Sequence, residues 1–168
     1  MLKKILAVLL IVPIVFFTLD LKPAIEVPVV QAATIQPSER DLRCLAENIY
    51  HEAKNQSEIG KIAVAFVTLN RSVNTRFPAD ICKVVYQKNT GICQFSWVCE
   101  VGKRVKDKDA FLEAKRIATI VLLRYNELID PTNGALFFHA HYIKPDWSKR
   151  VVKTVRIDDH IFYKLKST

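Results

Sequence analysis

The sequence has 168 residues, a formal net charge of +8 and a hydrophobic fraction of 50%. It contains no internal repeat or low-complexity tract, and the part after the N-terminal segment has the length of one domain, which excludes a two-domain architecture. The charge fits either a solvated surface or attraction to an anionic polymer. Because no aromatic-plus-basic RNA signature or helix-turn-helix spacing accompanies it, we expect no nucleic-acid partner.

The N-terminus has the pattern of an export signal. Two lysines precede an apolar stretch at residues 5–19, and small residues at Val30 and Ala32 suit a signal peptidase that cuts after Ala32. The apolar stretch is shorter than the roughly 20 residues of a spanning helix, so we expect no stable membrane insertion once the signal at residues 1–32 is cleaved. A long spacer before Val30 leaves an N-terminal anchor as the alternative. In both cases the remainder is extracytoplasmic, either periplasmic or secreted.

Apolar residues recur at helical spacing in four stretches of the remaining chain. Residues 33–40 form a polar lead-in, and residues 41–168 form the folded domain. Ser38 can cap the first helix and Asp80 the third, while Ile59 is expected on the core side of the second. The first expected helix begins near Glu39 and ends before Asn55, and the second runs from near Ser57 to Asn70 or Val73. The third runs from Asp80 through Val85. The fourth starts at Asp107 or Asp109 and is stopped by Pro131 and Gly134.

Four cysteines lie in the exported part, at Cys44, Cys82, Cys93 and Cys99. An even number in an oxidising compartment predicts disulfides. Of the three pairings we favour Cys93–Cys99, which closes a small loop, and therefore Cys44–Cys82. A four-thiolate zinc site is the alternative, but such sites usually contain CxxC pairs and this sequence has none.

Two parts of the chain lack the helical pattern, namely residues 87–105 and the C-terminal third. Residues 87–105 are expected to be irregular or hairpin-like, stapled by Cys93–Cys99. Extended segments follow at residues 135–142, 151–157 and 160–165, and the last two are joined by a turn at Asp158-Asp159. The predicted fold class is α+β, mostly helical, with a small antiparallel sheet at the C-terminal end.

Glu52 is out of place on the first helix because it shares the apolar face with Leu45 and Ile49. A carboxylate facing a core is costly unless it is paired or protonated. Burial raises the pKa of a carboxyl group, and a proton held near neutral pH is what a general acid needs. The alternative is a structural salt bridge to Arg71 or Arg76.

Two other glutamates and one loop also need an interpretation. Glu47 and Glu58 fall on the more exposed sides of their helices, and we expect them to be solvated. The loop Cys93-Gln94-Phe95-Ser96-Trp97 mixes amide, hydroxyl and aromatic groups, which suits stacking on a sugar ring while hydrogen-bonding its substituents. A core tryptophan with a polar loop edge is the alternative.

Three histidines could form a metal site. His139 and His141 alternate on an expected strand and so share a face, and His160 lies further along the chain. The alternative is ordinary histidines in an aromatic sheet. No second carboxylate or cysteine stands at metal spacing, so we expect neither a metal nor another cofactor.

Several separated motifs together resemble a known family. They are Cys44-Leu45-Ala46-Glu47-Asn48-Ile49-Tyr50-His51-Glu52-Ala53, Gly60-Lys61-Ile62-Ala63-Val64-Ala65, Leu69-Asn70-Arg71, Arg76-Phe77-Pro78, Val84-Val85-Tyr86-Gln87, Cys93-Gln94-Phe95-Ser96-Trp97, Gly134-Ala135 with Phe138-His139, Pro145 with Trp147, and His160 with Phe162-Tyr163. In this order they resemble the SleB-type cell wall hydrolases over essentially all of the exported part.

The resemblance implies a fold related to lysozymes and lytic transglycosylases and an enzyme that cleaves the glycan strand of peptidoglycan. The family's catalytic glutamate falls on Glu52. Where the family commonly has Glu-Ala-Arg-Gly-Glu, this chain has Glu52-Ala53-Lys54-Asn55-Gln56, so a role that needs a carboxylate at Gln56 is in doubt.

From these observations we expect a lytic transglycosylase that cuts between N-acetylmuramic acid and N-acetylglucosamine. Glu52 would act as acid and then as base, whereas simple hydrolysis ordinarily needs a second carboxylate. The expected substrate contacts are Gln94, Ser96, Tyr86, Tyr142 and His139. A zinc amidase with His139, His141 and His160 as ligands, a muramidase and a non-catalytic wall-binding module are the rivals. The expected partner is peptidoglycan, and the expected state is a monomer.

Overall fold

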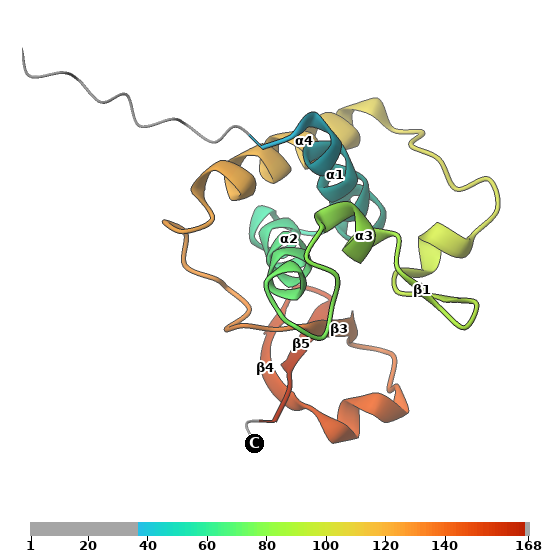
Figure 1. Cartoon of the computed structure of the whole chain (residues 1–168), viewed down its shortest axis with the longest axis vertical. Helices are drawn as coiled ribbons and strands as arrows, with labels where there is room; N and C mark the ends of the chain where they lie inside the picture. The colour runs from blue at the N-terminus through green and yellow to red at the C-terminus, as the bar shows by residue number, and fades with distance from the viewer. Residues whose placement is uncertain (1–36, 167–168) are drawn as a thin grey trace, which may run out of the picture. The chain divides into compact units, whose positions relative to one another are not determined.

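The computed structural model describes residues 37–166, so the predicted signal peptide at residues 1–32 lies outside the described part. Within residues 37–166, no helix combines the length and the apolar character needed to cross a membrane. Four α-helices and a three-stranded sheet make up most of the described chain (Figure 1). The predicted α+β class is confirmed.

The helices begin where their capping residues stand. α1 (Glu39–Ala53), α2 (Glu58–Ser72), α3 (Ile81–Val85) and α4 (Lys108–Arg124) follow one another along the chain. Each first turn is closed by a side-chain oxygen that accepts a backbone N–H, and the capping residues are Ser38, Ser57, Asp80 and Asp107. These starts agree with the sequence patterns.

The end of α4 differs from the prediction. The helix stops at Arg124, well before Pro131 and Gly134. The Arg124 carbonyl accepts the N–H groups of both Glu127 and Leu128 at 2.9 Å, which tightens the chain into a turn. A proline in the sequence sets only an outer limit for the end of a helix. Here the hydrogen bonds to the Arg124 carbonyl end α4 before that limit.

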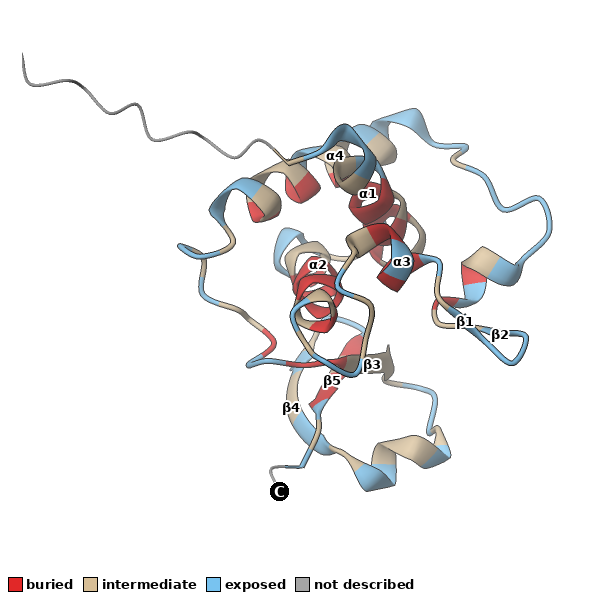
Figure 2. Cartoon of the chain, in the orientation of Figure 1, coloured by how far each residue is buried: buried red, intermediate tan, exposed pale blue. Residues whose placement is uncertain are grey.

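α1 is the central helix of the domain, since it packs against α2, α3 and α4. Its buried face meets those of α2 and α4 in the main hydrophobic core, which Figure 2 shows as the red sides of these helices. Leu45, Ile49, Phe66 and Ile117 are fully buried there. Ile59 was expected on this side but is 47% exposed, because it lies in the first turn of α2, outside the helix contact.

The sheet packs against α2. Strands β3 (Phe137–Ala140), β4 (Val152–Ile157) and β5 (His160–Lys164) pair antiparallel in the order β3-β5-β4. Phe162 of β5 is buried against Ala63 and Val67 of α2. The three predicted strands are confirmed, but the 3-10 helix η2 (Asp146–Arg150) between β3 and β4 was not predicted, because a single short turn has no periodicity to detect.

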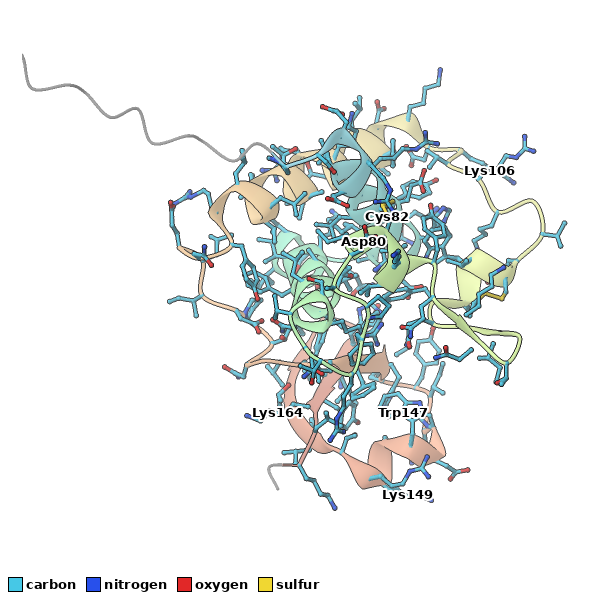
Figure 3. The ribbon with its side chains drawn as sticks, viewed as in Figure 1. Asp80, Cys82, Lys106, Trp147, Lys149 and Lys164 are labelled. Atoms are coloured by element: carbon cyan, nitrogen blue, oxygen red, sulfur yellow. A yellow bond between two sulfur atoms is a disulfide. The ribbon has the colours of Figure 1, made fainter. Side chains whose placement is uncertain are left out.

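The segment between α3 and α4 is the predicted stapled hairpin. β1 (Lys88–Asn89) and β2 (Ile92–Cys93) pair antiparallel, and the 3-10 helix η1 (Ser96–Cys99) follows. Cys93 and Cys99 are joined, as are Cys44 of α1 and Cys82 of α3. Both predicted pairings are confirmed, and the second ties α3 to the central helix beside the Asp80 cap (Figure 3).

Gln56, which follows α1, connects the helices to the turn between β4 and β5. Its amide donates to an Asp159 carboxylate oxygen and accepts the Asp159 N–H, both at 3.2 Å. Beside it, Asp158 accepts hydrogen bonds from the N–H and hydroxyl of Ser57. The approach is so close that a Cβ on Gly60 would collide with the Asp158 carboxylate. Since a glutamate could not donate to Asp159, this contact accounts for the amide at position 56.

The two disulfides should differ in their effect on stability. Removing Cys44–Cys82, which spans 38 residues, as Cys44→Ala with Cys82→Ala should lower the free energy of unfolding by about 4 kcal/mol. Removing Cys93–Cys99, which spans 6 residues, should cost about 2 kcal/mol. Urea unfolding of the two double variants measures both values, and a larger loss for the short loop would contradict this ranking.

Gln56→Glu should destabilise the domain by roughly 1–2 kcal/mol at pH 7, because it removes a donor to Asp159 and adds a like charge beside Asp158. Asn126→Asp, an amide-to-acid change at an exposed position, is the control and should stay within about 0.5 kcal/mol of the parent. Equal stabilities of all three proteins in urea would show that the Gln56 contact contributes nothing.

Candidate active site

A cavity of about 500 Å³ opens between the helices and the sheet. It is formed by the last turn of α1, α2, the start of η1, β3 and η2. Its lining residues are Glu52, Arg71, Gln94, Phe95, Ser96, Phe137, Phe138, Trp147, Arg150 and Val151. Glu52 is the only carboxylic acid among these described residues, so any acid–base chemistry in the cavity depends on it.

Glu52 is held by the burial of the rest of α1. The residues before it, Ile49 and Tyr50, are in the core, and this fixes the direction of the last turn. Within residues 37–166, the Glu52 carboxylate makes no hydrogen bond and no salt bridge within 4.0 Å, so the predicted alternative of a direct ion pair with Arg71 or Arg76 is wrong. Burial raises the pKa of Glu52 to about 7, although the nearby Arg71 cation acts in the opposite direction.

Two of the expected substrate contacts lie in this cavity. Gln94 and Ser96 line it together with Glu52, from the loop that Cys93–Cys99 closes. Tyr86, Tyr142 and His139 are not among its lining residues. His139 nevertheless lies next to the cavity wall, with its ring 5.5 Å from that of Trp147, whereas Tyr142 is 75% exposed.

Glu47 is not solvated as expected. Its side chain is only 16% exposed, accepts a hydrogen bond from Tyr86 and pairs with Arg43 at 3.0 Å. Tyr86, at the end of α3, covers this side of α1, a contact that the helical pattern of α1 alone does not reveal. Glu58 is exposed, as expected, and its carboxylate forms a salt bridge with Arg116.

Trp97 is a core residue and not an open stacking surface. It is 7% exposed, its indole N–H donates to Asn48 of α1, and His51 stacks on its ring at 4.3 Å. Asn48 also donates to Thr68 of α2 at 3.0 Å. The alternative of a core tryptophan with a polar loop edge is therefore correct, and the polar edge is the part that lines the cavity.

The aromatic wall of the cavity comes instead from β3 and η2. Trp147 contacts the rings of Phe137 and Tyr163 at centroid distances of 5.8 and 5.5 Å. Figure 3 shows Trp147 beside the sheet, at the start of η2. The sequence motifs include Trp147 without placing it at the cavity, and they do not include Arg150. The basic and aromatic segment after Pro145 is the one feature of the sequence that could have identified these two residues.

The histidines do not form a shared ligand set. His139 bonds to the Tyr163 hydroxyl on one face of the sheet, while His160 packs against Phe138 and Phe162 on the other. Among the described histidine, cysteine and acidic side chains, the only group of three with ligand atoms within 4.8 Å of one another is Asp41, Asp80 and Cys82. Cys82 is in a disulfide and Asp80 pairs with Arg40, so this group is unsuited to a metal.

Residues 55–163 match the model of a family described as cell wall hydrolase. This match begins three residues after Glu52 and so does not bear on that residue. Two related curated proteins are the spore cortex-lytic enzymes of Bacillus cereus, 27% identical, and Halalkalibacterium halodurans, 30% identical. The alignments cover 76% and 74% of this chain but only 45% and 35% of those proteins, so the chain spans less than half of their length.

Two solved structures are similar to the domain. The catalytic domain of the germination-specific lytic transglycosylase SleB from Bacillus anthracis has a TM-score of 0.58 and 26% identity, covering 76% of this chain and 97% of that one. The catalytic domain of the Bacillus cereus SleB protein has a TM-score of 0.54 and 25% identity, covering 76% and 91%.

The raised pKa of Glu52 predicts a pH-dependent cost to folding. An unfolded glutamate ionises near its ordinary pKa of 4.5, whereas Glu52 in the folded chain ionises near 7. Stability should therefore fall as pH rises through this window, by up to about 3 kcal/mol, and level off above it.

Glu52→Gln lacks this titration. It should match the parent at pH 4 and be the more stable protein at pH 8 in urea unfolding. Glu58→Gln, at an exposed carboxylate, should show no such pH-dependent gain. A constant difference between Glu52→Gln and the parent at every pH would mean that the pKa of Glu52 is not raised.

Proposed function

The chain belongs to the cell wall hydrolase family, and on that premise we propose that it is an enzyme that cleaves the glycan strand of peptidoglycan. The bond cut is the one between N-acetylmuramic acid and N-acetylglucosamine, and the reaction is lytic transglycosylation. Glu52 is the catalytic residue, and residues 41–168 form the catalytic domain. The name of the similar Bacillus anthracis domain, a lytic transglycosylase, supports this reaction class.

The observation that carries the proposal is a single, largely desolvated carboxyl group in a cavity of about 500 Å³. Glycoside hydrolysis ordinarily uses two carboxylates, one as acid and one to activate water or to form a covalent intermediate. Among the described residues that line the cavity, Glu52 has no such partner. A reaction in which one group serves twice fits this arrangement.

In the first step Glu52 donates its proton to the glycosidic oxygen. The bond between that oxygen and C1 of the muramic residue breaks, the oxygen leaves as a hydroxyl of the glucosamine, and C1 becomes oxocarbenium-like. A pKa of about 7 keeps a large fraction of Glu52 protonated at neutral pH, which is the state this step requires.

In the second step the muramic 6-hydroxyl attacks C1 and forms a 1,6-anhydro ring. The hydroxyl proton passes to the Glu52 carboxylate, which restores the acid for the next turnover. No water is consumed and no second carboxylate is needed.

The cavity walls suit a sugar. Gln94 and Ser96 offer an amide and a hydroxyl to ring substituents, and the exposed edge of Trp147 offers an apolar surface. The net charge of +8 favours approach to an anionic wall polymer. Action on peptidoglycan takes place outside the cytoplasm, as the N-terminal pattern predicts, and the domain acts as a monomer.

The test is mass spectrometry of soluble products from purified peptidoglycan. The chain should release anhydro-muramoyl fragments, and Glu52→Gln should lose at least about 1,000-fold of this activity because no proton donor remains. Glu58→Gln is the matched control and should retain full activity.

Each alternative product has a distinct meaning. Fragments that end in reducing muramic acid would replace transglycosylation by hydrolysis, as in a muramidase. Free stem peptides would indicate an amidase, and binding without soluble product would indicate a wall-binding module. Full activity of Glu52→Gln would remove Glu52 from the mechanism.

A further inference from the structure

Arg71 is a buried cation whose hydrogen bonds are incomplete. It lies on α2, is only 3% exposed, and also lines the cavity that holds Glu52. Its Nε donates to the Leu136 carbonyl at 2.7 Å, but Nη1 is buried and has no partner within the described chain. Leaving a buried cationic donor unsatisfied is costly, so its presence requires an explanation.

The surroundings of Arg71 hold the guanidinium in place and give it no anion to pair with. Its central carbon lies 5.3, 5.1 and 5.8 Å from the ring centroids of Phe77, Phe95 and Phe137. Attraction to the ring faces offsets part of the cost of burial. In residues 37–166 no carboxylate comes within 4.0 Å of it, so this arginine is not part of a direct salt bridge.

Few other charges face Glu52. From α2 there is Arg71, from the segment after η1 there are Glu100 and Lys103, and from η2 the cavity is lined by Arg150. Glu100 and Lys103 pair with each other at 2.7 Å, so their effects on Glu52 largely cancel. Arg150 is exposed, and its charge is screened by water. Arg71 is therefore the one desolvated cation in this set.

We propose that Arg71 is a positioning residue that stabilises the Glu52 carboxylate after the proton has been given to the glycosidic oxygen. The inference rests on the proposed function. When Glu52 protonates the substrate it becomes an anion in a poorly hydrated cavity, and the fixed positive charge on α2 lowers the energy of that state. The carboxylate then persists until the 6-hydroxyl proton arrives.

The proposed role requires the Arg71 guanidinium to lie near the Glu52 carboxyl group without contacting it. A close ion pair would hold Glu52 ionised at neutral pH, and no acid would be available for the first step. Without any cation, burial alone would hold the proton too tightly to be donated. A cation in the same cavity, beyond direct contact, leaves the pKa of Glu52 near neutrality, with burial as the larger effect.

The pH profile of the cleavage rate separates this role from a purely structural one. Arg71→Met should lower kcat roughly 100-fold, with a small change in KM, since it removes charge stabilisation near the reacting atoms. The descending limb of its pH profile should move to higher pH, because the pKa of Glu52 rises. Arg71→Lys keeps the charge and should recover most of both effects, and Arg76→Met, at an exposed arginine, should change neither.

If kcat of Arg71→Met falls while the descending limb of its pH profile stays at the same pH, the proposal is overturned. A packing defect lowers the rate without changing the pH of that limb. The same result in Arg71→Lys and Arg71→Met would also overturn it, since the charge would then be irrelevant.

A second measurement needs neither activity nor an Arg71 variant. The NMR signal of the Arg71 Nε–H should shift with pH near 7 in the parent chain, as Glu52 ionises, and should lose that shift in Glu52→Gln. A signal that does not respond to Glu52 would overturn the coupling. If the chain released no anhydro products while the shift was present, the proposed function would fail and the Arg71–Glu52 coupling would stand.

Discussion

The burial of α1 on three sides is the constraint on which the site depends. Packing against α2, α3 and α4 leaves the helix no freedom to rotate, and a disulfide to α3 adds a covalent restraint. Asn48 extends this restraint by accepting from Trp97 and donating to Thr68. The last turn of α1 therefore presents Glu52 to the cavity in one direction, while η1 brings its polar edge to the same place.

The chemistry follows from a balance between burial and charge at that position. Burial favours the protonated form of Glu52, and Arg71 favours the ionised form. Neither effect alone suits a group that must first release a proton and then recover one. The aromatic rings around Arg71 come from the loop after α2, the loop between β2 and η1, and β3, so the balance requires these segments to be packed together.

Local patterns in the sequence predicted the elements and the chemical group, but not the walls of the cavity. Glu52 was detectable because a carboxylate interrupts an apolar helical face, and the disulfides because the chain has an even number of cysteines. Arg150 and Trp147 reach the cavity only through the packing of η2 beside β3. The prediction that Glu47 is solvated is wrong for the same reason, since the residue that covers it, Tyr86, belongs to another element. Distant neighbours leave no local pattern.

The proposed mechanism requires the folded chain to keep Glu52 protonated near neutral pH. Carbon-13 NMR of the glutamate side-chain carboxyl carbons in the parent chain, assigned by comparison with Glu52→Gln, tests it most directly. One carboxyl signal, absent from the variant, should titrate with a pKa of about 7. A Glu52 signal that titrates near the ordinary value of 4.5 would contradict the proposed mechanism, because Glu52 would then be ionised at neutral pH and could not serve as the acid.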